Sequence, residues 1–226
     1  MTTRPGTSRP SRYVRRWIWP PDKWERLTTV ADLADDAADV LDVGGRGHEM
    51  RLLRPVGTTC VSANVEDPCD VRIPHDRLPF ADASYTAVTS CDVLEHIPPD
   101  ARAAHVSELV RVARRQVVLC FPAWSPEKEA AERRLHQQLA DLGTSFDFLD
   151  EHLEHGLPRV ADVVAAALAA APGTQVQVRY QQGIEESDQV LVDAVTAYKR
   201  HRVAPLLRFV RAWLRRPGPR FSDTAT

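Results

Sequence analysis

The residues best suited to chemistry stand at 42–47, where an acid precedes a group of glycines. Asp42 lies in a short apolar stretch, and Gly44, Gly45 and Gly47 follow it. Glycines let a backbone approach a ligand closely, and a carboxylate binds an ammonium group well in a half-dry cleft. A plain tight turn is the alternative. In dinucleotide-binding domains the acid comes ~20 residues after the glycines, so the order found here counts against a nucleotide-dependent oxidoreductase.

A second set of reactive side chains lies at the end of the predicted strand at 85–91. Cys91 and Asp92 stand at the end of this strand, and Glu95 and His96 come shortly after it. An imidazole titrates near neutral pH, which makes His96 the candidate catalytic base. The favoured alternative is that Glu95 and His96 only cap the turn from a strand to a helix.

The elements that must position these residues are strands alternating with helices. Strand-like runs stand at 40–43, 58–65, 85–91 and 117–121, and helical patterns at 22–36, at 50–53 and from 98 to Ala113. This alternation predicts an α/β fold, a Rossmann-like, doubly wound and mostly parallel sheet with helices on both faces. Ligands of such sheets bind at the carboxyl ends of the strands, near the switch in strand order.

The chain after residue 122 is expected to form extra, mostly helical elements. Ser125 and Pro126 have the form of a helix start, and a second helix is predicted at 158–171. Alternation predicts a strand at 176–180, and further helices are expected at 187–202 and 206–213. The side chains of the 158–171 helix expected to face the core are those of Val160, Val163, Val164, Ala167 and Leu168.

Two motifs resemble those of class I methyltransferases of the type-11 domain family, which use S-adenosylmethionine (SAM). Asp42 and Gly44 match the family's acid-x-Gly-x-Gly-x-Gly pattern, although Arg46 and His48 stand where its second and third glycines are usual. Residues 78–98, LPFADASYTAVTSCDVLEHIP, resemble the family's LPF-x-D-x-S-F-D segment with the strand and VLEH that follow. The resemblance covers roughly residues 38–122.

The resemblance implies SAM as the cofactor, and it implies which residues hold it. In the family an acid holds the amino-acid end of SAM, the glycine backbone lies against the cofactor, and the second strand ends in an acid that binds the ribose. Carried over, the cofactor-binding residues are Asp42, Gly44, Gly45, Asn64, Cys91 and Asp92. Asn64 lacks the usual charge at the ribose position, where Glu66 and Asp67 are the alternatives.

The implied reaction is transfer of a methyl group to a small-molecule or glycan-type acceptor. The alternative is a non-catalytic protein of the same fold that serves as a binding partner, which the altered glycine pattern favours. Residues 146–158 resemble a segment downstream of the core in bacterial members of the family, where it is expected to form a lid. The predicted parts are a disordered basic arm at 1–21, a methyltransferase domain at 22–186, and a C-terminal helical extension and tail at 187–226.

The net charge of −2 is unevenly distributed. Residues 1–29 carry +5, residues 199–226 carry +7 and the middle carries −14. An acidic body argues against nucleic acid as a partner, and docking of the last helix on its own domain is favoured over contact with an anionic membrane. The four cysteines are predicted to be free thiols in a cytoplasmic protein. No metal is expected, because His152 and His155 have no third ligand marked near them.

Overall fold

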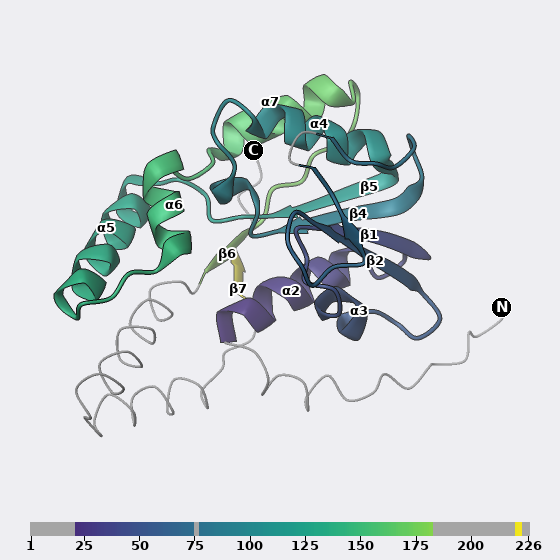
Figure 1. Cartoon of the computed structure of the whole chain (residues 1–226). Coiled ribbons are helices and arrows are strands. Elements are labelled where there is room, and N and C mark those ends of the chain that lie inside the picture. Colours follow the sequence, from purple (N-terminus) through teal and green to yellow (C-terminus); the bar gives the residue numbers. More distant parts are fainter. Residues whose placement is uncertain (1–20, 75–76, 183–219, 223–226) are drawn as a thin grey trace. The chain divides into compact units, whose positions relative to one another are not determined.

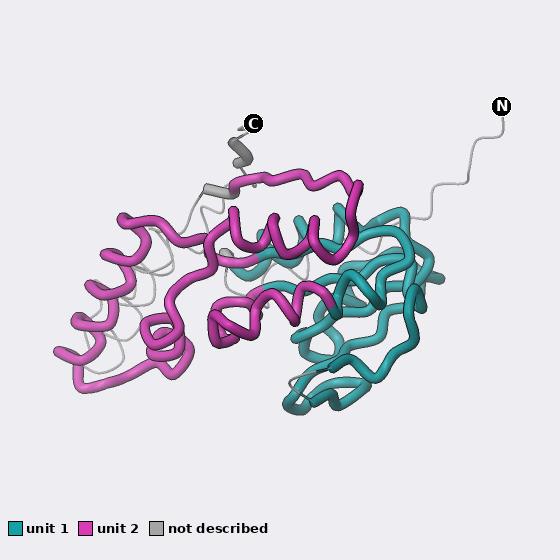
Figure 2. Tube along the Cα trace, turned by 90° about the horizontal axis from the view of Figure 1, so that it is seen from above, with its two compact units in different colours: residues 1–91, 108–120 teal, residues 92–107, 121–226 magenta. Residues whose placement is uncertain are grey.

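The computed structural model describes residues 21–74, 77–182 and 220–222, which fall into two compact units (Figures 1 and 2). Unit 1 holds the described residues up to Cys91 together with Glu108–Cys120. Unit 2 holds Asp92–Ser107 and the described residues from Phe121 onward. Residues 1–20 of the arm predicted at 1–21, and the predicted helices at 187–202 and 206–213, lie outside the described residues, whereas Pro21 is the first residue of a helix.

Unit 1 is built on a five-stranded parallel sheet in the order β3-β2-β1-β4-β5. The strands are β1 (Asp39–Val43), β2 (Thr59–Asn64), β3 (Val71–Arg72), β4 (Tyr85–Cys91) and β5 (Ala113–Cys120). The order reverses between β1 and β4, which is the switch point where open α/β sheets bind ligands. This arrangement confirms the predicted Rossmann-like fold, and Figure 1 shows the strands side by side.

Both faces of this sheet are covered, because the strands are apolar on both sides. Val40 of β1 packs against helices α2 (Pro21–Leu33) and α3 (Glu49–Leu53). Leu41 and Val43, which point to the other face, pack against the end of helix α4 (Arg102–Val112). Asp42 therefore belongs to the face of α2 and α3, by the strict alternation of a strand.

Two features of the sheet were not predicted. Strand β3 has only two residues, too few for a hydrophobic pattern to show. Strand β5 begins at Ala113, so Ala113 is a strand residue and not the last residue of a helical face. Its first residues, which precede the apolar run at 117–121, form ion pairs of Arg114 with Asp39 and of Arg115 with Asp36. Charged residues of this kind are common on sheet edges, and they hide the strand from a search for apolar runs.

Besides the first part of α4, the described residues of unit 2 form a short 3-10 helix and three α-helices. They are η1 (Leu94–His96), α5 (Pro126–Asp141), α6 (Asp147–His155) and α7 (Val160–Ala170). Ser125 caps α5 as predicted, since its Oγ accepts a hydrogen bond from Lys128 N at 3.1 Å. Leu135 and Leu139 of α5 pack with Leu149 of α6 into a small core.

The expectations for residues 158–182 need two corrections. Leu168 does not face the core, because its side chain is 42% exposed. It lies about 140° around the helix from the buried Val163, at 100° per residue. The strand expected at 176–180 is β6 (Tyr180–Gln182), which pairs antiparallel with β7 (Arg220–Ser222), whereas Val176 and Val178 are exposed and outside it. No helix in the described part of the chain is long and apolar enough to cross a membrane.

Candidate functional site

The glycine turn after β1 is held at the carboxyl edge of the sheet. Gly44 N donates to Ala63 O of β2 at 2.7 Å, and Gly44 has a φ of 83°. A Cβ on Gly45 would lie 1.8 Å from Asp42 Oδ2, so no side chain fits there. Gly47 has a φ of 34° and lies against the Pro68 carbonyl. Gly45 and Gly47 thus meet the steric demands of the turn, and the side chains of Arg46 and His48 are exposed.

Asp42 is a buried acid in direct contact with this turn. Its side chain is 3% exposed, and its Oδ1 accepts a hydrogen bond from Thr89 Oγ1 at 2.8 Å. Burial raises the pKa of Asp42 to about 7, against the lowering effect of Thr89, and the charge of Glu49 raises it further. None of these influences is a cation, so a positively charged ligand beside Asp42 would favour its ionised form.

The partners of Asp42 were not found from the sequence. Thr89 pairs with Asp42 in the register of β1 and β4, a contact that only the strand order reveals. The available signal was weak, because Thr89 is one of three serine and threonine residues of β4, with Thr86 and Ser90. Glu49, at the start of α3, is bound by Lys23 Nζ at 2.6 Å. Glu49 is therefore paired with a cation, whereas no positive charge acts on Asp42 among the described groups.

Asn64 links the end of β2 to the glycine turn. Its Nδ2 donates to Gly44 O at 2.9 Å, and its Oδ1 accepts from Val65 N at 2.7 Å. Both ends of the amide are thus engaged with backbone. Glu66 and Asp67, the alternatives for the ribose, are exposed, and Asp67 lies 3.8 Å from Arg72.

The end of β4 lies next to that of β1. Cys91, its last residue, pairs in register with Cys120 at the end of β5. Asp92 follows with a φ of 57°, a left-handed conformation that aspartate tolerates better than most residues. The Ser90 hydroxyl is buried and has no hydrogen-bond partner among the described residues. Asp42, one residue before the end of β1, therefore lies at the same edge of the sheet as Asn64 and Cys91, the last residues of β2 and β4.

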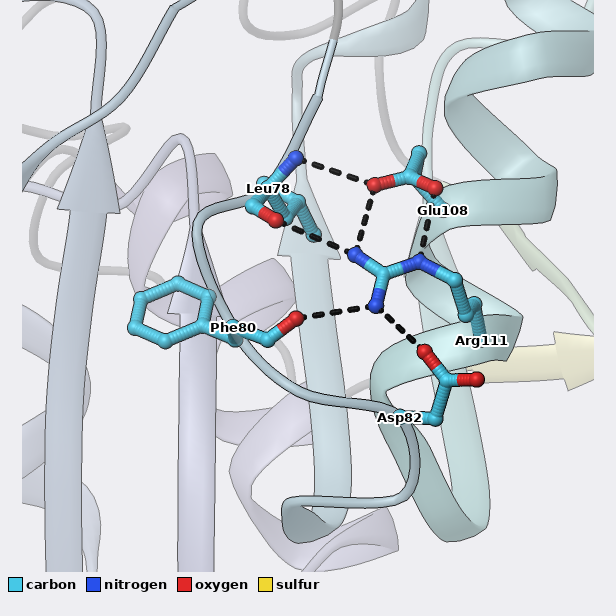
Figure 3. Close-up of polar contacts among 5 residues, drawn as sticks. All are labelled: Leu78, Phe80, Asp82, Glu108 and Arg111. Atoms are coloured by element: carbon cyan, nitrogen blue, oxygen red, sulfur yellow. Dashed lines mark hydrogen bonds and ion pairs between the residues drawn. The ribbon is translucent and has the colours of Figure 1, made fainter.

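The LPF motif fixes the loop that leads into β4, as Figure 3 shows. Arg111 of α4 donates to the carbonyls of Leu78 and Phe80 and to the carboxylates of Asp82 and Glu108. Glu108 in turn accepts a hydrogen bond from Leu78 N at 3.0 Å. The hydrogen bonds and charge of Arg111 lower the pKa of Glu108 to about 2. These residues act on structure, because they position β4.

His96, the candidate base, lies in unit 2 and contacts α6. Its Nδ1 is 2.7 Å from Glu151 Oε2, and its ring lies 5.2 Å from Phe148 and 4.9 Å from His152. Burial and the neighbouring His152 lower the pKa of His96, while Glu151 opposes them. His96 is therefore more than the cap of a turn, since it belongs to a cluster that the sequence did not indicate.

Comparison with known proteins identifies the family that this region resembles. Residues 41–121 match the family described as "Methyltransferase domain", which confirms the resemblance seen in the two motifs. No curated protein matches the sequence.

Solved structures show the same fold. The YcgJ protein from Bacillus subtilis is 16% identical with a TM-score of 0.50, and the match covers 83% of this chain and 82% of that one. The [4+2]-cyclase SpnF is 13% identical with a TM-score of 0.51, and the match covers 86% and 76% of the two chains. Because one of these neighbours is a cyclase, the fold alone does not determine the reaction.

Proposed function

We propose that this chain is a SAM-dependent methyltransferase that acts on a small-molecule or glycan-type acceptor. The family match over residues 41–121 supports methyl transfer. The observation that carries the proposal is Asp42, a buried carboxylate packed over Gly45 with a pKa raised to about 7, on which no cation acts among the described groups. SAM carries an ammonium group that would supply the missing positive charge.

The described residues fit this cofactor. Asp42 would bind the ammonium end, and the backbone of Gly44 and Gly45 would lie against the cofactor, since no Cβ stands in the way. Asn64 would contribute to the ribose side, and Cys91 and Asp92 would line the adenosine side. When bound, SAM supplies a methyl group activated by its positively charged sulfur. The protein's part is then to align the acceptor and to exclude water.

Because the methyl group is already activated by the sulfur, transfer depends mainly on the alignment of the acceptor with it. We therefore assign no obligatory base to the reaction. The catalytic role of His96 stays a prediction. An oxygen, nitrogen or carbon atom of the acceptor is compatible with the proposal.

Titration calorimetry with S-adenosylhomocysteine (SAH), the demethylated product, tests the proposal. We expect a micromolar dissociation constant, or ~−8 kcal/mol. Asp42→Asn should weaken binding by about 1.5–3 kcal/mol, because a charge-assisted contact is lost. Asp36→Asn is the matched control: it removes the same charge from an exposed residue that precedes β1, at the opposite end of that strand, and should bind normally.

The second candidate is the non-catalytic protein of the same fold. Both polar ends of Asn64 are bonded to backbone, and Arg46 and His48 replace usual glycines. If neither SAM nor SAH produces heat or a shift in melting temperature at millimolar concentration, this candidate replaces the first. Normal binding by Asp42→Asn would instead show that the cofactor lies elsewhere.

A further inference from the structure

Unit 2 brings the adjacent residues Glu95 and His96 close to His152, which is distant from them in sequence. Glu95 and His96 come from η1, and His152 comes from α6. One potential ligand atom from each residue lies within 4.8 Å of those from the other two. Glu95 is 2% exposed, and the side chains of His96 and His152 are 24% and 16% exposed. His155, which the sequence pairs with His152, is not part of this group.

Each of these histidines has a carboxylate within hydrogen-bond distance of its Nδ1 atom. Glu151 Oε2 lies 2.7 Å from Nδ1 of His96, and Glu132 Oε1 lies 3.1 Å from Nδ1 of His152. A carboxylate at Nδ1 keeps the proton on that nitrogen and leaves the lone pair on Nε2. Histidines that bind metals are oriented in this way by a carboxylate or a carbonyl. The outer pair of glutamates is an observation independent of the three inner residues.

The charges of the cluster also favour a cation. Three carboxylates surround two imidazoles, and Lys128 Nζ is 3.6 Å from Glu132. The negative charge of Glu95 acts on Arg102. The guanidinium of Arg102 also donates hydrogen bonds to the carbonyls of Ile97, His155 and Gly156. Carboxylates taken out of water are costly unless they are paired or coordinate a metal.

We propose that Glu95, His96 and His152 bind a divalent transition metal, with Zn²⁺ as the ion that best suits two imidazoles and a carboxylate. Bonds of ~2.1 Å in a tetrahedron put neighbouring ligand atoms ~3.4 Å apart. Ligand atoms separated by the full 4.8 Å would therefore have to approach one another by about 1.4 Å when the ion binds. Three protein ligands leave one position open, as in catalytic zinc sites, and an oxygen or nitrogen of a ligand would fit there.

This site would change the expected role of His96. An Nε2 atom that binds a metal cannot accept a proton at the same time, so His96 would be a ligand and not a free base. The metal proposal stands independently of the cofactor proposal, because its residues are different ones.

Metal titration of the full chain, freed of metal by a chelator, tests the proposal. We expect one Zn²⁺ per chain by calorimetry, and a Co²⁺ spectrum without a thiolate charge-transfer band. His152→Ala should weaken binding more than about 100-fold, and Glu151→Gln, which alters only the outer contact, by about 10–100-fold. His155→Ala is the matched control from the same helix and should bind the metal normally.

Several outcomes would overturn the proposal. They are the absence of Zn²⁺ binding by the intact chain, binding unchanged in both His152→Ala and Glu151→Gln, and a thiolate band that disappears on replacing a cysteine. Circular dichroism shows whether each variant is folded. If His152→Ala does not fold, Glu151→Gln still tests the proposal. An SAH titration of the same samples separates the two proposals, since failure of one leaves the other standing.

Discussion

Asp42 illustrates a conflict between stability and binding at a single residue. The pKa of its carboxyl rises from 3.8 to about 7 on folding, because the group is buried. A raised pKa means that the folded state holds the proton more tightly than the unfolded state. The stabilising effect of that proton is therefore complete below pH ~4 and is lost as the pH rises to about 7. Above this window the ionised group costs about 4 kcal/mol, at 1.36 kcal/mol for each unit.

Asp42→Asn should accordingly stabilise the cofactor-free protein at pH 8. Asparagine has the same shape and can still accept the hydrogen bond from Thr89, but it carries no charge to bury. Urea unfolding from pH 4 to 8 measures the effect. The gap between wild type and variant should open as the pH rises, by a few kcal/mol in all. Parallel pH profiles for the two proteins would contradict the raised pKa.

The same ionisation should make cofactor binding depend on pH. A bound ammonium group prefers the ionised carboxylate, so SAH should bind more tightly as the pH rises from 6 to about 7, by up to about tenfold for each unit. Above the pKa of Asp42 this gain levels off. Asp42→Asn should flatten the profile and Asp36→Asn should preserve it. An affinity for SAH that is independent of pH in the wild type would argue against contact between Asp42 and the ammonium group.

At the scale of elements, the predicted and the missed features have a common explanation. Strand β4 was predicted at its observed bounds, Tyr85–Cys91, because a strand-like run follows a turn sequence. Strand β3 and the start of β5 were missed, because edge pairing and ion pairs define them. The LPF segment was recognised as a motif, but its physical role is the clamp of Arg111 between α4 and the loop before β4.

Arg111→Met tests this clamp. It removes donors to two backbone carbonyls and two carboxylates and should lower the free energy of unfolding by about 2 kcal/mol, less than for a fully buried pair. Arg133→Met, which breaks the exposed pair with Glu129, is the control and should cost about 0.5 kcal/mol or less. Urea unfolding measures both. Equal losses of unfolding free energy in the two variants would show that the contacts of Arg111 stabilise the protein no more than an exposed ion pair does.

The pH dependence of Arg111→Met provides a second check. Glu108 has its pKa lowered to about 2, so its stabilising effect is present above pH ~4.5 and is lost as the pH falls to about 2. Without Arg111 this loss on acidification should be smaller. A variant that loses stability over this window as steeply as the wild type would mean that other groups hold the pKa of Glu108 down.

At the scale of the whole molecule, the sequence predicted which strand ends meet and missed most of the contacts made there. Asp42, Asn64 and Cys91 were predicted as one group from the resemblance to the methyltransferase family, and parallel strands that end at one edge of a sheet bring such residues together. The contact of Thr89 with Asp42 and those of the two glutamates with His96 and His152 were missed. The sequence separations of these contacts range from 20 to 55 residues. Local patterns carry little information over such distances, whereas the register of the strands and the packing of α5, α6 and η1 determine them.

Hydrogen exchange should place the two proposed ligands in different units. SAH is expected to slow exchange at the backbone amides of 44–47 and 64–66, because these loops order around the cofactor. Zn²⁺ is expected to slow exchange at 94–97 and 147–155, where η1 and α6 supply its ligands. Each ligand should also raise stability by mass action, about 2.7 kcal/mol at 100 times its dissociation constant. Exchange slowed by SAH in α6 but not at 44–47 would move the cofactor away from Asp42, and slowing by Zn²⁺ at Cys91 and Cys120 alone would place the metal on thiols.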